Sequence, residues 1–109
     1  MAAKNELLPG TLDMLVLRVL ARSELHGWGI PQKLEQLSQS ALQVDEGSLY
    51  PSLYRMEGKG WIVAVWRMTE NNRRAKYYAL TRTGRKQLEK EQQLWDRMSA
   101  AIALVMQNA

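Results

Sequence analysis

The C-terminal quarter of the sequence is one long helical pattern, and its length limits the folds that this chain can adopt. From Thr81 to about residue 107, apolar side chains recur with heptad spacing, with Glu91 as an interruption. The heptad positions are Leu88, Trp95, Met98, Ile102 and Val105. At about 1.5 Å per residue, about 25 residues span nearly 40 Å, which is longer than a small helical core. We therefore expect these five residues to form a dimer interface with a second copy, rather than a helix folded back on its own domain.

Composition excludes several classes of protein. A chain of 109 residues forms one domain with a modest core. It has no cysteine and a single histidine, His26, so disulfides, thiolate chemistry and a multi-histidine zinc site are excluded. There is no phosphate-binding glycine loop and no evident nucleophile–base pair or carboxylate pair. We predict a protein without a metal or cofactor that is not an enzyme.

No apolar segment is long enough to predict a membrane span. The first residues lack the apolar stretch of a signal peptide, and the apolar run from Leu12 to Ala21 is short and contains Arg18. We expect a cytoplasmic protein with no membrane partner.

Two helices are predicted before residue 40. The first covers Leu7 to Ala21, with Pro9 in its first turn and Asp13 near its positive end. The second follows the glycine turn at "HGWG" and carries an apolar stripe of Ile30, Leu34 and Leu37. His26 fits a structural place at its entry. Val44, farther along, is compatible with a brief strand.

The segment "EGSLYPSLYRMEGKGW" predicts a third, short helix from Leu49 to about Gly58. Ser48 is a suitable N-cap, which would place Pro51 in the first turn, where a missing N–H costs little. The apolar stripe is Leu49, Leu53 and Met56, and the residues off that stripe should face water. Those outward residues are Tyr50, Ser52, Tyr54 and Arg55.

A β-hairpin should follow the third helix. "WIVAVWRM" and "KYYAL" have strand composition and flank the polar turn "TENNRRA". Of the adjacent Tyr77 and Tyr78, one should be buried and the other exposed. Three short helices followed by a hairpin predict a mostly α winged helix-turn-helix (residues 1–80), with a dimerisation helix (residues 81–109), in one compact body.

Positive charge is concentrated in one third of the chain. Between Arg55 and Lys90 there are ten Lys/Arg and three Glu, a net +7, whereas the remaining residues sum to −3. The plainer interpretation of such a cluster is a charged face that only contacts solvent. Its location on the third helix and hairpin favours nucleic-acid binding instead.

The chain resembles the PadR-like transcriptional regulators, especially their short, single-domain members. The matching segments run from Leu7 to Leu88, and the most specific are "GSLYPSLYRME" and "RRAKYYALTRTGR". Trp28 stands where the family usually has tyrosine, and Gly58 where a charged residue is commoner. The resemblance implies a homodimer that binds double-stranded DNA, usually a repressor, with the third helix in the major groove and the wing on the adjacent backbone or minor groove.

Hydroxyls and tyrosines of the third helix, and cations and an amide of the wing, are the expected DNA contacts. The set is Ser48, Tyr50, Pro51, Ser52, Tyr54, Arg55, Lys59, Asn72, Arg73, Arg74 and Lys76. Two copies should bind a two-fold symmetric operator.

The resemblance also implies a small aromatic effector, because some relatives hold flat ligands between the long helices of two subunits. Trp95 would then form part of the wall, although an interface role without a ligand is the plainer interpretation. A winged-helix module that binds protein without sequence-specific DNA binding is the alternative function.

Overall fold

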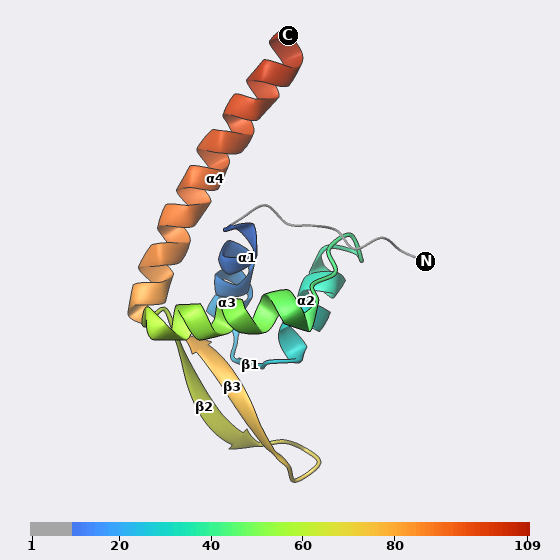
Figure 1. Ribbon diagram of the computed structural model, residues 1–109, viewed down its shortest axis with the longest axis vertical. Coiled ribbons are helices and arrows are strands. Elements are labelled where there is room, and N and C mark those ends of the chain that lie inside the picture. The colour runs from blue at the N-terminus through green and yellow to red at the C-terminus, as the bar shows by residue number, and fades with distance from the viewer. Residues whose placement is uncertain (1–9) are drawn as a thin grey trace.

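A computed structural model describes residues 10–109 as four helices and a small sheet (Figure 1). In chain order the elements are α1 (Thr11–Arg22), β1 (Leu25–His26), α2 (Gly29–Leu37), α3 (Glu46–Gly58), β2 (Ile62–Met68), β3 (Arg74–Leu80) and α4 (Arg82–Asn108). The predicted fold, a winged helix-turn-helix with a long C-terminal helix, is confirmed. The expected helix start at Leu7 and the role of Pro9 lie outside the described residues. The described part of α1 follows Gly10, whose φ is +85°.

The sheet has three antiparallel strands in the order β1-β3-β2. The third strand is not at Val44, which lies in the irregular segment before α3 and packs against the core. It is the two-residue β1, in which Leu25 pairs with Tyr78 and His26 with Tyr77. So short a strand exists only because β3 passes beside it, and local sequence carries no signal for that.

The start of α3 differs from the prediction. Asp45, rather than Ser48, is the N-cap, and its Oδ1 accepts a hydrogen bond of 2.8 Å from the Ser48 N–H. The helix therefore begins three residues earlier than expected, at Glu46, and Pro51 lies in its interior rather than in its first turn. A proline there gives up one helical hydrogen bond.

The helix α3 ends at Gly58, as predicted, and Gly60 forms the turn that follows. Its φ of +75° suits glycine, and its N–H donates to the Glu57 carbonyl at 3.0 Å. The Trp61 N–H donates to the Met56 carbonyl, also at 3.0 Å, which completes a Schellman motif. This turn directs the chain from α3 into the hairpin.

The core lies where α1, α2, α3, the sheet and the base of α4 meet. Its fully buried side chains include Leu17, Ile30, Leu49 and Met56. Leu37, at the end of α2, is 63% exposed and stands outside it. Leu88, which we expected at a dimer interface, is instead only 6% exposed within this core. That prediction is wrong, because the first turns of α4 pack against the body of the same chain.

The base of α4 is held closely against the hairpin. The Thr81 hydroxyl caps the helix by accepting from the Gly84 N–H at 3.0 Å, and it also donates to the Gly60 carbonyl at 2.6 Å. Gly84 is buried, and a Cβ there would collide with the carbonyl oxygen of Trp61. This close approach fixes the angle at which α4 leaves the body.

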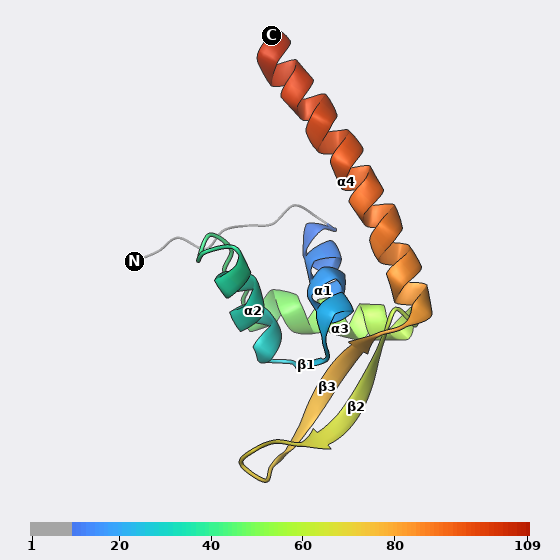
Figure 2. The ribbon, with the colours of Figure 1, turned by 180° about the vertical axis from the view of Figure 1, so that it is seen from behind.

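Beyond its base, α4 projects away from the rest of the molecule, as Figures 1 and 2 show from opposite sides. No residue from position 92 to position 109 is buried. Several of these exposed side chains are large and apolar, which is costly for an isolated helix in water. None of the helices formed by residues 10–109 has the length and apolarity needed to cross a membrane.

A buried polar cluster joins α1 to α3. Asp13 is 8% exposed, and its carboxylate accepts from the Ser52 hydroxyl at 2.5 Å. Nη2 of Arg55 donates to both Asp13 oxygens, at 2.6 and 2.7 Å. We call these three residues the Asp13 cluster. It fixes the rotation of α3 about its own axis relative to α1, because both partners lie on one side of α3.

We predict that Asp13→Ala lowers the free energy of unfolding by about 1–3 kcal/mol. The change leaves the buried Ser52 hydroxyl and the Arg55 guanidinium without their acceptor. Denaturant unfolding followed by circular dichroism measures it.

The matched control is Glu24→Ala, which breaks an Arg67–Glu24 pair of similar geometry with distances of 2.7 and 2.9 Å. The Glu24 side chain is 38% exposed, against 11% for Asp13, so its loss should have the smaller effect. Equal losses of stability for the two variants would contradict a special role for the Asp13 cluster.

Candidate nucleic-acid interface

The exposed face of α3 consists mainly of residues near its middle. Tyr54 is 82% exposed, and Tyr50 41%. Ser48 and Pro51 are also exposed. Tyr50 is held from one side, because a Cβ added to the buried Gly27 would lie only 3.0 Å from its hydroxyl oxygen. The glycine turn before α2 therefore makes room for the Tyr50 ring and sets its direction.

Two residues predicted on this face are used elsewhere. Ser52 was expected to face water, but it is 3% exposed and donates its hydroxyl hydrogen bond to Asp13. That prediction is wrong, because the side chain lies against α1. Arg55 keeps a half-exposed side chain, yet its guanidinium is bound by the same carboxylate. The sequence pattern did not predict that Asp13 binds Ser52 and Arg55, because a negative charge near a helix start is already explained by the helix dipole.

The wing is the β2–β3 hairpin, which projects below α3 in Figure 1. At its tip the Thr69 N–H donates to the Arg73 carbonyl at 2.7 Å, and Asn72 adopts a φ of +61°. Asn72 tolerates this left-handed conformation better than most residues. Arg73 is exposed, and within residues 10–109 its guanidinium has no ion-pair partner. It is thus available to an anion from outside the chain.

The other predicted cations of this region are held in place by neighbours. Nζ of Lys76 lies 3.3 Å from a carboxylate oxygen of Glu57 and so ties the wing to α3. The Arg74 guanidinium lies 5.0 Å from the ring centre of Trp66, and Nζ of Lys59 lies 4.7 Å from that of Trp61. These contacts orient the charges without removing them from solvent.

The hairpin also holds an exposed tryptophan that was not among the predicted site residues. Trp66 follows Ile62 and Ala64 on the same face of β2 by alternation, and it is 57% exposed. The alternation alone suggests a core residue. Only the structure shows that the body of the protein ends before this point of the strand. On β3, Tyr78 is buried as expected of one tyrosine, while Tyr77 is half-buried against His26 rather than fully exposed.

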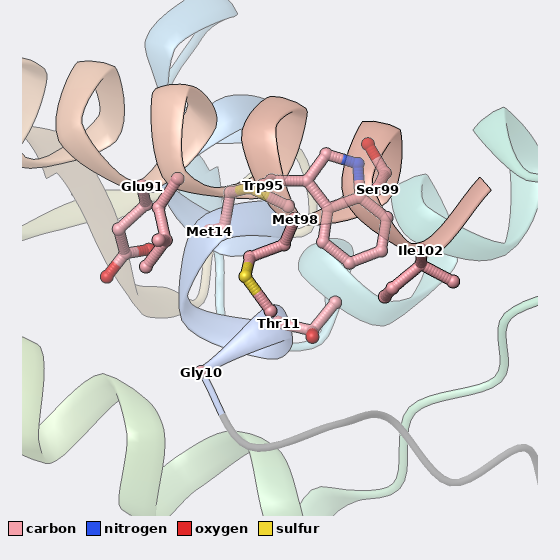
Figure 3. A pocket seen from close by; sticks show the side chains of 9 residues that line it. Gly10, Thr11, Met14, Glu91, Trp95, Met98, Ser99 and Ile102 are labelled. Carbon is pink, nitrogen blue, oxygen red and sulfur yellow. The ribbon is translucent and has the colours of Figure 1, made fainter. Parts of the chain in front are cut away.

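A second feature is an apolar groove of about 480 Å³ between the start of α1 and the middle of α4 (Figure 3). Its wall contains Met14, Trp95 and Met98, and Glu91 lies at one end. Oε1 of Glu91 accepts from Gln87 at 3.3 Å, while Oε2 is buried and has no hydrogen-bond partner within residues 10–109. Burial raises the pKa of the Glu91 carboxyl.

Among residues 10–109 there is no group of three or more His, Asp or Glu side chains placed to hold a metal ion. His26, which was expected to be structural, stacks on Trp28 with ring centres 4.0 Å apart.

Comparison with known proteins agrees with this geometry. Residues 16–90 match the model of the "Transcriptional regulator PadR-like family". A transcriptional regulator of Mycobacterium tuberculosis is 30% identical over 87 residues, covering 80% of this chain and 78% of that protein.

Solved structures of the same family are similar over nearly the whole chain. A PadR-like transcriptional regulator from Bacillus cereus has a TM-score of 0.79 and 29% identity, covering 92% of this chain and 95% of that one. A PadR family transcription regulator from Clostridium difficile has a TM-score of 0.75 and 27% identity, covering 89% and 99%. The chain therefore belongs to the PadR-like family, whose members are transcriptional regulators and not enzymes.

Proposed function

We propose that the protein is a cytoplasmic homodimer that binds a two-fold symmetric DNA operator and represses transcription. The observation that carries the proposal is the pairing of an exposed α3 with a basic wing, linked by the Lys76–Glu57 ion pair. Residues 55–90, which include the end of α3 and the whole wing, carry a net charge of +7. A polyanion is the ligand that such a surface favours.

The residues divide by chemistry within this proposal. Those of α3 offer hydroxyls, aromatic rings and one aliphatic proline ring to the major groove: Ser48, Tyr50, Pro51 and Tyr54. Those on and near the wing offer positive charge and an amide to phosphates: Lys59, Asn72, Arg73, Arg74 and Lys76. Arg55 contributes indirectly, because its hydrogen bonds to Asp13 hold α3 in position against α1.

Dimerisation through α4 follows from its unpartnered apolar side chains. Trp95, Met98, Ile102 and Val105 are 44–63% exposed and lie along one side of the helix. A second copy would cover them and place two DNA-binding surfaces in a fixed relation, about one helical turn apart on the operator. Residues 1–80 then form the DNA-binding unit and residues 81–109 the dimerisation helix, with the base of α4 serving both through Leu88.

Repression is the simplest outcome of such binding, because a dimer seated on a promoter excludes other proteins from the same DNA. The groove beside Trp95 suits a small aromatic effector, since its wall is mostly apolar and Trp95 offers a ring for stacking. An effector bound there would act on α1 and α4 together, and so on the spacing of the two surfaces.

Selection of bound duplexes from a random DNA pool, at defined salt, tests the proposal. We expect an enriched site with two-fold symmetry. If no duplex is retained even at low salt, the protein-interaction alternative replaces DNA binding.

We predict that Arg73→Ala weakens binding to all duplexes and lowers the slope of log K against log salt by about one unit. The reason is the loss of one phosphate contact and the counterion that it releases. Fluorescence anisotropy with labelled duplex across a salt series measures both quantities. Arg18→Ala, at an exposed cation of α1, is the control and should leave the slope unchanged. An Arg73→Ala slope equal to that of the parent would remove Arg73 from the interface.

We predict that Ile102→Asp raises the dimer dissociation constant by at least about 100-fold, because each subunit would bring a carboxylate into an apolar contact. Sedimentation velocity measures the change. Ala100→Asp adds the same charge to an exposed position on the opposite side of α4 and should leave the dimer intact. A parent protein that is monomeric at micromolar concentration would contradict the assembly.

We predict that some planar aromatic compounds change the tryptophan emission of the parent and that Trp95→Phe loses most of this response. Titration with a chemically diverse panel provides the measurement. A response that persists unchanged in Trp95→Phe would place the ligand elsewhere, and no response from any compound would argue against an effector site in the groove.

A further inference from the structure

Trp66 lies on a part of β2 that leaves the body of the protein. Its face of β2 begins in the core, with Ile62 2% exposed, and leaves the body of the protein toward the tip. At that point Trp66 and Met68, on the same face, are 57% and 58% exposed. Two large apolar side chains exposed on one face of a strand form a small apolar surface that another molecule can cover.

The chain holds the Trp66 ring with charged residues rather than covering it. Across the hairpin, Trp66 pairs with Lys76 and Met68 with Arg74. The Arg74 guanidinium stacks at 5.0 Å from the Trp66 ring centre, and Lys76 is fixed by Glu57 of α3. The ring is therefore oriented, and it lies on the side of the wing from which Lys76 reaches α3.

The surroundings decide which kind of partner fits. An apolar ring and a thioether bordered by Arg74, Lys76 and the exposed Arg73 match a partner that is apolar and anionic at short range. A DNA backbone has this character, because each apolar deoxyribose face lies between two phosphates. A neutral protein surface would leave the cations without partners.

We propose that Trp66 is a DNA-contacting residue, packing its ring on deoxyribose along the wall of a duplex groove while Arg74 binds the neighbouring phosphate. This rests on the proposed DNA-binding function and adds an apolar, salt-independent contribution to the electrostatic one. Apolar side chains of other DNA-binding proteins act at duplex grooves in a related way.

The test compares Trp66→Ala, Trp66→Phe and Arg74→Ala on the selected duplex across a salt series. Trp66→Ala should weaken binding about tenfold, at the lower end of the range for aromatic rings stacked on bases, and leave the salt slope unchanged. Arg74→Ala should lower the slope by about one unit. Trp66→Phe should retain much of the affinity, because a ring is still present.

Tryptophan emission gives a second readout. Addition of duplex should change the emission of the parent, and Trp66→Phe should lose that change. Trp28→Phe is the matched control, since Trp28 is similarly exposed, at 52%, but lies at the start of α2. It should keep the response. Thermal unfolding of each variant confirms that the wing is intact.

Three results would overturn the inference while leaving DNA binding in place. Trp66→Ala could match the parent in affinity and emission, or it could lower the salt slope as Arg74→Ala does, which would reduce Trp66 to a support for Arg74. Tighter, Trp66-dependent binding of single strands would indicate stacking on bases instead. A parent that binds no duplex would instead defeat the proposed function itself.

Discussion

The carboxylate of Asp13 is the contact on which the DNA-facing surface depends. It lies in the first turn of α1, and it binds two residues of α3 that are three positions apart, Ser52 and Arg55. A buried carboxylate is tolerated only when its oxygens are paired, so α3 can take only the rotation that brings both donors to it. That rotation turns Tyr50 and Tyr54 outward, buries Ser52 and ties the half-exposed Arg55 side chain to α1.

The positively charged residues on and near the wing are positioned to different degrees. Lys76 is anchored to α3 by Glu57, and Arg74 and Lys59 rest on tryptophan rings, so their charges are presented in defined directions. Arg73 at the turn has no such constraint within the described residues. Partly preorganised cations lose less side-chain entropy when they meet phosphates, and a free one adapts to local backbone geometry.

Burial along α4 changes sharply, and the change separates two roles within one helix. Gly84 and Leu88 pack into the body of the chain, whereas every residue from position 92 onward is exposed. The groove beside Trp95 lies at this transition, between the start of α1 and the middle of α4. A ligand or a second subunit at this place would touch both the dimerisation helix and the helix that carries Asp13.

The sequence by itself determined the order of the four helices, the hairpin and the end of α3 at Gly58, because each depends on residues within a few positions of one another. It misplaced the start of α3, since Asp45 and Ser48 are both good caps and only the folded chain decides between them. Tertiary structure alone decided that Ser52 and Leu88 are buried, that Leu25 and His26 form a strand and that Trp66 is exposed. Periodicity shows which residues share a face, whereas the extent of the neighbouring element determines where along that face burial ends.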